Sequence, residues 1–122
     1  MSDGAGEHDY SIDLASHDGL QLLRLNGEFD LRAAPDLREA ILDALGAESA
    51  SGPLLVDMSG LDFLDSTIIS VLLTAVQRGQ EMGRQLRLAG VAPHVSRILG
   101  VTGIESVLPS YPTLEEAASA EA

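Results

Sequence analysis

Residues 54–72 read LLVDMSGLDFLDSTIISVL, and they join a short apolar run to the longest helical pattern in the chain. The continuous apolar run from Leu54 to Val56 is typical of a strand buried on both faces of a sheet. Ser59-Gly60 predicts a loop, and the residues from Ser66 to Met82 have the apolar spacing of a helix that Gly83 ends. A buried strand that leads into a helix indicates an α/β protein.

The N-terminal part of the chain adds two strands and a helix. Residues 10–14 alternate apolar and polar side chains, which predicts a half-buried strand. Asp18-Gly19 is typical of a tight hairpin turn into a second strand, residues 20–25, which Asn26-Gly27 is expected to end. A helix is expected over residues 35–45, because proline suits the first turn of a helix and the apolar residues of this segment share one face.

Strands and helices continue to alternate in the rest of the chain. The expected elements are a strand over residues 85–89, a helix from Pro93 to Leu99 closed by Gly100, a short strand at Val107-Leu108 and a final helix capped by Thr113. This order predicts one α/β domain, with a mixed sheet of four to five strands that opens with a β-hairpin and is covered by about four helices. We expect a flexible acidic tail at residues 1–9, the folded domain at residues 10–117 and a frayed C-terminus at residues 118–122.

The charge of the chain limits the partners that it can bind. Its 122 residues include 19 Asp and Glu against 7 arginines and no lysine, and the net charge is −12. Residues 1–65 hold fourteen acids and three arginines, whereas residues 66–122 hold five acids and four arginines. Like charge disfavours direct binding to nucleic acid or to an anionic membrane. The acidic first half is either an ordinary solubilising surface or a face that steers a basic protein partner.

Targeting signals and membrane segments are not evident in the sequence. No apolar run approaches the roughly 20 residues that a membrane-spanning helix needs. The N-terminus carries acid where a secretory signal peptide carries base. We therefore expect a cytoplasmic protein that has no membrane segment.

The residues that would carry catalysis or hold a cofactor do not form a recognisable pattern. The chain has no cysteine, and His8, His17 and His94 lack the spacing of metal ligands. The G-x-S-x-G turn of a nucleophilic serine is absent. Asp57 follows an apolar strand as a phosphoacceptor would, but the lysine that such sites use is missing. We therefore expect no enzyme activity, no metal and no cofactor.

The helix that begins at Ser66 has one polar stripe on a helical wheel, and the stripe includes Ser66 itself. Ile69 and Leu73 lie at its border, so we expect both to be partly exposed beside Ser66. An exposed hydroxyl next to apolar surface is what a kinase target within a protein interface needs. The spacing alone favours a simpler interpretation, in which Asp65 caps the free N–H groups of the first turn.

Three blocks of the sequence resemble the STAS-domain anti-sigma factor antagonists. They are residues 25–30 (LNGEFD) with 34–37 (APDL), residues 55–67 (LVDMSGLDFLDST), and residues 85–91 (QLRLAGV) with 98–104 (ILGVTGI). The first block is similar to the G-E-x-D segment and first helix of the family, the second to its central strand and signature loop, and the third to its closing strand and helix. The resemblance covers roughly residues 10–117 and implies the STAS fold.

The resemblance also implies a function in partner switching. Asp65, Ser66 and Thr67 match the family signature, so Ser66 takes the position of the phosphorylated serine, and Asp30 is implied to lie near it. The unmodified protein would bind an anti-sigma factor, a serine kinase of the ATP-binding histidine-kinase-like class, and so release a sigma factor. Phosphorylation would end that binding, and a serine phosphatase would reset it. The expected partner-binding residues are Asp30, Asp62, Asp65, Ser66, Thr67, Ile69, Ser70 and Leu73.

Ile68 departs from the family signature, which usually has glycine at this position. Glycine lets a partner backbone approach closely, and a β-branched side chain would crowd that approach. The departure keeps open the alternative of a non-phosphorylated STAS scaffold. The family resemblance leaves a second alternative, a STAS module that binds a small ligand or nucleotide. The sequence also leaves open whether the protein forms a homodimer.

Overall fold

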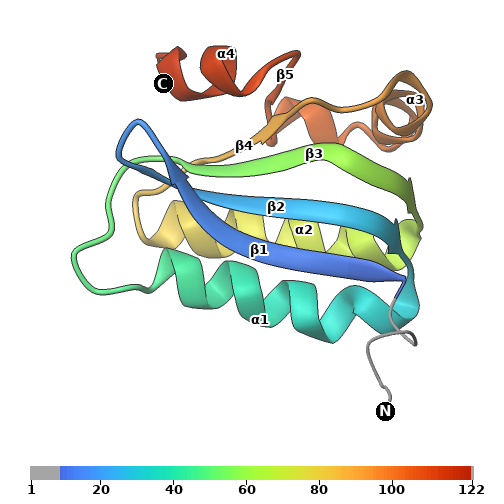
Figure 1. Ribbon diagram of the computed structural model, residues 1–122, viewed down its shortest axis with the longest axis horizontal. Helices are drawn as coiled ribbons and strands as arrows, with labels where there is room; N and C mark the ends of the chain where they lie inside the picture. Colours follow the sequence, from blue (N-terminus) through green and yellow to red (C-terminus); the bar gives the residue numbers. More distant parts are fainter. Residues whose placement is uncertain (1–8, 122) are drawn as a thin grey trace.

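A computed structural model describes residues 9–121 of the chain, and Figure 1 shows its arrangement. The elements are β1 (Tyr10–His17), β2 (Leu20–Phe29), the 3-10 turn η2 (Leu31–Ala33), α1 (Ala34–Leu45), β3 (Leu54–Leu64), α2 (Ser66–Glu81), β4 (Leu86–Ala89), α3 (Pro93–Thr102), the 3-10 turn η3 (Ile104–Ser106), β5 (Ser110–Tyr111) and α4 (Leu114–Ser119). The five strands form one sheet in the order β1-β2-β3-β4-β5. β1 and β2 are antiparallel, and the other neighbours are parallel. The predicted mixed α/β sheet with an opening hairpin is confirmed.

The hairpin turn is where the sequence places it. Asp18 and Gly19 both have positive φ angles, 53° and 83°, as a two-residue turn between twisted antiparallel strands requires. The start of β1 is also held to β2, because the carbonyl of Asp9, the residue before β1, accepts the N–H of Glu28 at 2.9 Å. The flexible tail expected for residues 1–9 otherwise lies outside the described residues.

β2 does not end at Asn26-Gly27 as expected, but continues to Phe29. Gly27 has a φ of 97°, and a Cβ at this position would overlap the backbone of Asp9. The pairing of β2 with β3 shifts register on both sides of this segment. A bulge that only glycine fits therefore carries the strand past residues that usually end one.

β3 likewise continues through the expected loop at Ser59-Gly60 and ends at Leu64. Gly60 pairs with Asn26, and a Cβ on Gly60 would collide with the Asn26 side chain. The glycine therefore marks a close approach of two strands rather than a loop. As a result β2 and β3 end side by side, immediately before η2 and α2.

The C-terminal elements also differ from expectation. α3 passes through Gly100 and ends at Gly103, which adopts the left-handed conformation that suits a helix end. Val107 and Leu108 are not a strand, because both of their N–H groups bond to the carbonyl of Ile104 in a turn. β5 forms three residues later. α4 spans Leu114–Ser119, and Thr113 caps its start as predicted.

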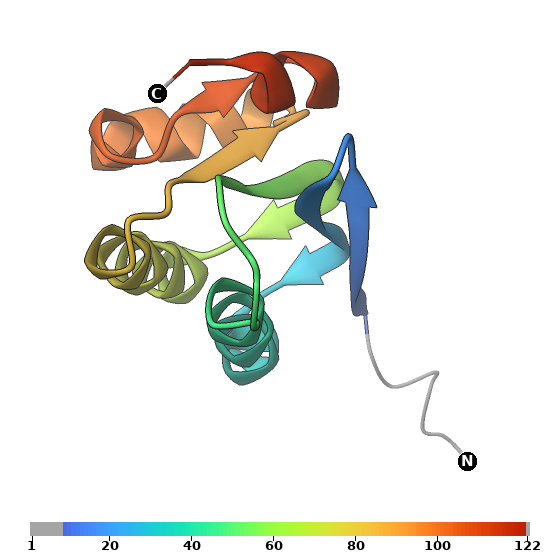
Figure 2. The same cartoon turned by 90° about the vertical axis from the view of Figure 1, so that its left-hand side faces the viewer.

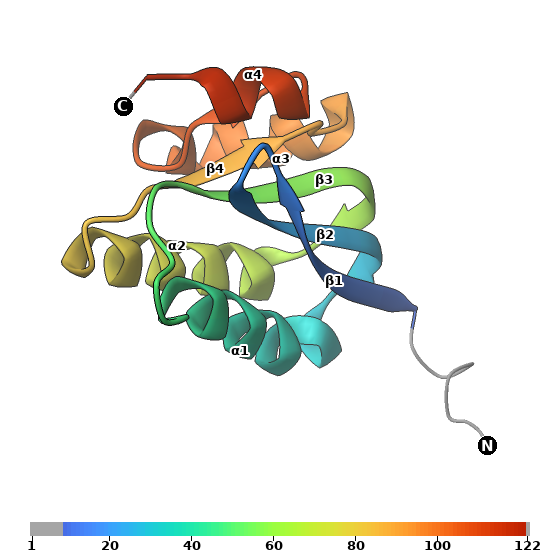
Figure 3. The same ribbon diagram turned by 60° about the vertical axis from the view of Figure 1, so that its left-hand side comes forward.

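Helices cover both faces of the sheet unequally. Figure 2 shows α1, α2 and α3 in a row on one face, and Figures 2 and 3 show α4 on the other. The larger core lies under the three helices and includes Leu37, Leu72 and Leu99. The smaller core, around Leu22 and Ala117, lies under α4. α2 is therefore enclosed by the sheet and by neighbouring helices, and only its outer side is open to solvent.

Arg84 ties the end of α1 to the sheet. Its buried guanidinium donates to the carbonyls of Ala44, Leu45 and Gly52 and to the side chain of Gln21, at 2.7–3.1 Å. Burial lowers the pKa of this arginine. The contacts tie the last turn of α1 and the connection to β3 to β2 and to the start of β4.

Candidate functional site

The candidate site lies at the end of the sheet where β2 and β3 terminate. Phe29 and Leu64 are paired neighbours in the parallel ladder, and each is the last residue of its strand. Asp30 and Asp65 follow them directly, so the topology brings these two carboxylates to the same edge of the sheet. Figure 1 shows α1 and α2 starting together at this edge.

Asp65 caps α2, as its position before the helix predicts. Its Oδ1 accepts the N–H of Thr67 at 2.9 Å and the N–H of Ile68 at 3.2 Å. Both bonds satisfy donors that have no partner inside the helix. Ser66 is the first residue of α2, and its side chain is exposed. The cap therefore fixes the backbone on both sides of Ser66 while its hydroxyl remains open to solvent.

The polar stripe predicted for α2 is also confirmed. Every residue of the stripe is exposed, namely Ser66, Ser70, Thr74, Gln77 and Glu81. Thr67, which lies beside the stripe, is half-buried. A protein that docks on Ser66 can therefore continue along the outer side of α2.

Of the two apolar residues at the border of the stripe, only one is exposed as predicted. Leu73 is exposed, but Ile69 is only 7% exposed, so the expectation of a partly exposed Ile69 is wrong. Ile69 belongs to the same buried cluster as Val95 and Leu99 of α3, and Figure 2 shows α3 after α2 in the row of helices on this face of the sheet. A helical wheel drawn for α2 alone cannot predict burial by other elements of the fold. Ile69 supports the first turns of α2 from inside and offers no apolar surface to a partner.

Ile68 is completely buried. Its side chain points into the core beneath α2, away from the surface that carries Ser66. The β-branched residue that stands in place of the usual glycine therefore does not cover the Ser66 hydroxyl.

Asp30 sits in a network of charges beside the site. It caps η2 by accepting the N–H of Arg32 at 2.9 Å, and its carboxylate also pairs with the Arg32 guanidinium at 3.1 Å. The hydrogen bonds from Arg32 lower the pKa of Asp30, and the pKa of Arg32 is raised in return. Arg32 pairs with Asp9 as well, at 3.0 Å. The arginine is thus held by two carboxylates, and the edge of the site remains acidic.

Sequence reasoning missed two apolar side chains at this edge. Leu31, which follows Asp30, is 67% exposed. Phe63, which precedes the last residue of β3, is 46% exposed. No local pattern signals the exposure of Phe63, because burial does not alternate at the end of β3: Leu61 and Leu64 are buried, and the two residues between them are exposed. Exposed apolar side chains next to carboxylates are typical of a protein-binding surface.

His94 also contacts the site. Its Nε2 lies 2.8 Å from the carbonyl oxygen of Asp62, and both side chains are exposed. This contact joins the first turn of α3 to the last residues of β3. The three acidic positions expected in the site lie near the ends of β2 and β3. Asp30 follows β2, Asp62 is in the last part of β3, and Asp65 follows β3.

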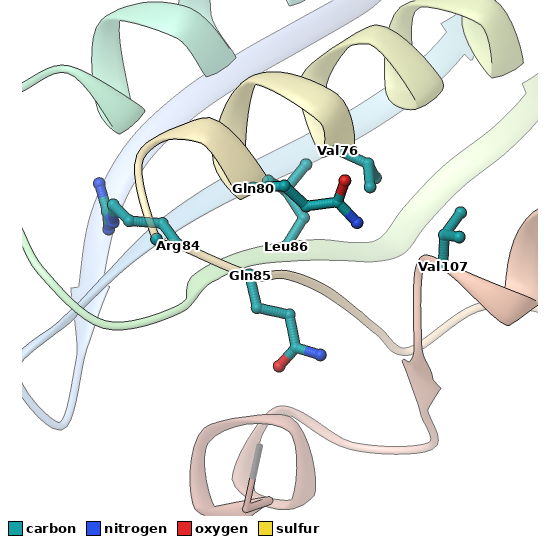
Figure 4. Close-up of a pocket in the computed structure, with 7 residues that line it drawn as sticks. Val76, Gln80, Arg84, Gln85, Leu86 and Val107 are labelled. Carbon is teal, nitrogen blue, oxygen red and sulfur yellow. The ribbon is translucent and has the colours of Figure 1, made fainter.

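A separate hollow of about 320 Å³ lies at the opposite end of α2. Figure 4 shows Gln80 and Gln85 beside it and the Arg84 side chain turned away, toward the carbonyls that hold its guanidinium. None of the expected site residues lines this hollow. Within residues 9–121 no group of three or more His, Asp or Glu side chains is placed to hold a metal ion. In the same part of the chain no helix has the length and apolar character needed to cross a membrane.

Comparison with known proteins identifies the domain. The STAS domain family matches residues 11–117. The anti-sigma-F factor antagonist RsfA of Mycobacterium tuberculosis is 33% identical over 104 residues, which are 85% of this chain and 81% of the relative. Another M. tuberculosis protein, named as a candidate anti-anti-sigma factor (Rv2638), is 38% identical over 96 residues, 79% of this chain. The match spans 65% of that relative, slightly less than two thirds of its length.

Solved structures agree with this match. The crystal structure of an anti-sigma factor antagonist from Mycobacterium paratuberculosis superimposes with a TM-score of 0.76 and 30% identity, covering 90% of this chain and 92% of that one. The fold and the site define a small α/β domain with an exposed serine at a capped helix start. The chain belongs to the STAS domain family, as the sequence resemblance predicts.

Proposed function

We propose that this protein is an anti-sigma factor antagonist, which binds an anti-sigma factor and so releases a sigma factor. The observation that carries the proposal is the exposed Ser66 at the first position of α2, at the same end of the sheet as the acidic residues of the strand ends and the exposed Leu31 and Phe63. The names of the relatives RsfA and Rv2638 support it. In this function the protein acts in the cytoplasm by binding rather than by catalysis.

Phosphorylation of Ser66 is the proposed switch. A phosphate adds about −1.5 to −2 charges at neutral pH. The start of α2 tolerates this charge, because helix N-termini favour anions. A docked partner does not, because a dianion beside Phe63 and Leu31 must be desolvated, which costs several kcal/mol unless a cation pairs with it. The switch therefore acts at the interface and needs no refolding of the domain.

The charge of the site defines the partner further. Asp30, Asp62 and Asp65 lie at the end of the sheet where Ser66 begins α2, and the first half of the chain carries most of the acidic residues. A basic surface on the anti-sigma factor would be steered toward this edge. We propose that this anti-sigma factor is itself the kinase that modifies Ser66, of the ATP-binding histidine-kinase-like class, and that a serine phosphatase removes the phosphate.

Ile68 no longer favours the alternative of a non-phosphorylated scaffold. The reason for that alternative was crowding of Ser66, and the buried Ile68 side chain leaves the hydroxyl uncovered. The alternative of a nucleotide-binding module has little support either, because the guanidinium next to the hollow at Gln80 and Gln85 is committed to carbonyl groups. We therefore keep the phosphorylated switch as the proposed function.

The test is to incubate the protein with ATP and each purified anti-sigma serine kinase of the source organism, and to map the phosphate by mass spectrometry. We expect a single phosphate on Ser66 and none on the Ser66→Ala variant. Ser70→Ala is the matched control, since Ser70 is exposed one turn further along the same stripe. Phosphate only on Thr67 or Ser70, or no phosphate with any kinase, contradicts the proposed switch.

A further inference from the structure

The outer face of α3 carries an exposed apolar stripe. Val101 is 86% exposed, more than any other large apolar side chain in residues 9–121, and Ile98 is exposed as well. His94, Ile98 and Val101 are spaced by four and three residues, so they lie on one side of the helix. The opposite side is fixed in the core by Val95 and Leu99. The stripe therefore lies on the solvent side of a helix whose other side is packed in the core.

The charge of α3 differs from that of the rest of the protein. The chain has a net charge of −12, yet the segment Pro93–Thr102 contains no acidic residue. Its one arginine, Arg97, is exposed next to the stripe and makes no hydrogen bond or ion pair with any residue that the structure describes. An apolar stripe beside an unpaired cation fits a surface that is apolar and carries a carboxylate.

The stripe begins at the candidate site. The contact between His94 Nε2 and the Asp62 carbonyl places the first turn of α3 against the end of β3, next to Phe63. Figures 1 and 3 both show α3 at the end of the sheet where α2 starts. A protein that covers Ser66 and Phe63 therefore lies close to His94, where the stripe begins.

We infer that the stripe of His94, Ile98 and Val101, together with Arg97, is a second docking surface for the anti-sigma factor, an inference that rests on the proposed function. The interface then has two parts of different chemistry. A basic part of the partner faces Asp30, Asp62 and Asp65, and an apolar part with a carboxylate faces α3. This combination selects one orientation of the partner, since a partner turned around would place like charges together at both ends.

A second copy of this chain fits the stripe less well. Twofold pairing of α3 with itself would bring the two Arg97 side chains toward each other and would join two bodies that each carry −12 charges. The partner that docks at Ser66 has no such restriction. We therefore assign the stripe to the partner and keep self-association as an outcome of the test.

The experiment compares variants in titration calorimetry with the purified anti-sigma factor that binds the wild-type chain. Val101→Asp should weaken binding by about tenfold or more, because it places a charge in an apolar contact. Arg97→Glu should weaken it by about threefold or more. Leu14→Asp is the matched control, since Leu14 is 65% exposed on β1 at the far edge of the sheet and its variant should bind within about twofold of wild type. Thermal unfolding of each variant checks that the fold is kept.

The outcomes separate this inference from the proposed function. If the wild-type chain binds and loses the partner on phosphorylation, but Val101→Asp binds as well as wild type, the second surface is wrong and the proposed function stands. If Val101→Asp turns a dimer into a monomer in light scattering with unchanged partner affinity, the stripe belongs to a second copy and the inference is overturned. If the wild-type chain binds no anti-sigma factor, the proposed function fails, and the inference fails with it.

Discussion

Asp30 and Asp65 perform the same structural task on neighbouring strands. Each follows one member of the paired residues Phe29 and Leu64, and each caps the helical turn that comes next. The N–H of Asp65 also bonds to the carbonyl of Phe29 at 3.3 Å. The start of η2 and the start of α2 are thus held together, and the backbone that carries Ser66 is fixed from both sides.

Loss of the Asp65 cap should destabilise the domain measurably. Asp65→Ala leaves the N–H groups of Thr67 and Ile68 without their acceptor, and we expect the free energy of unfolding to fall by about 1 kcal/mol. Urea denaturation followed by circular dichroism measures the change. Asp65→Asn is the control, because an asparagine oxygen can still cap, and it should lose less than half as much. Equal losses for the two variants contradict the capping role.

Phe63 should contribute to binding far more than to stability. Its ring is almost half exposed beside Ser66, so Phe63→Ala is expected to change stability little and to weaken binding of the anti-sigma factor by about 2 kcal/mol, roughly thirtyfold. Surface plasmon resonance gives the affinity. Met82→Ala is the matched control, because Met82 is similarly exposed at the opposite end of α2. An equal effect of the two substitutions would remove Phe63 from the proposed interface.

Gly27 should tolerate substitution less well than Gly19, although both have positive φ angles. A Cβ on Gly19 meets no atom within 4 Å, whereas a Cβ on Gly27 would overlap the carbonyl of Asp9. Both alanine variants have to adopt an unfavourable backbone conformation, of order 1 kcal/mol, and Gly27→Ala must also displace the start of β1. We expect its midpoint in urea to fall well below that of Gly19→Ala. Similar midpoints would show that the bulge does not hold Asp9.

Tyr10 should make stability depend on pH at the alkaline end. Its hydroxyl donates to Asp36 Oδ2 at 2.6 Å, and this bond, with burial, raises the pKa of Tyr10 from 10.0 to about 12. The protonated form is therefore favoured by folding. Its contribution is complete below pH 10 and is lost as the pH rises toward 12, where the folded protein must also release the proton.

Chemical denaturation at several alkaline pH values measures this dependence. We expect the free energy of unfolding of the wild type to decline more steeply between pH 10 and about 12 than that of Tyr10→Phe. Asp36→Asn should remove most of the difference, because it removes the charged acceptor. Parallel declines in the wild type and in Tyr10→Phe would contradict the assigned pKa.

The parts of the fold that local chemistry determines were predictable from the sequence. The Asp18-Gly19 turn, the Asp65 cap and the polar stripe from Ser66 each depend on residues close together in the chain. The ends of β2 and β3 could not be predicted in this way. Gly27 and Gly60 are needed because distant segments of the chain approach them closely, but in the sequence both look like turn residues.

The errors at the site have the same origin. Ile69 is buried in a core cluster that also contains Val95 and Leu99 of α3, and a pattern within residues 66–82 does not contain this information. β5 has only two residues, so it shows no alternation, and its place is set by hydrogen bonds from the N–H groups of Leu88 and Gly90 to the carbonyls of residues 109 and 111. The exposed Leu31 and Phe63 become recognisable only when the strand ends are known.

The central claim is that phosphate on Ser66 ends binding of the anti-sigma factor. The direct measurement is calorimetric titration of the anti-sigma factor with the unmodified protein and with protein phosphorylated on Ser66, with kinase-treated Ser66→Ala as the control. We expect the phosphate to weaken binding about a hundredfold, or roughly 2.8 kcal/mol, while the Ser66→Ala protein binds like the unmodified one. Equal affinity of the phosphorylated and unmodified proteins would contradict the account.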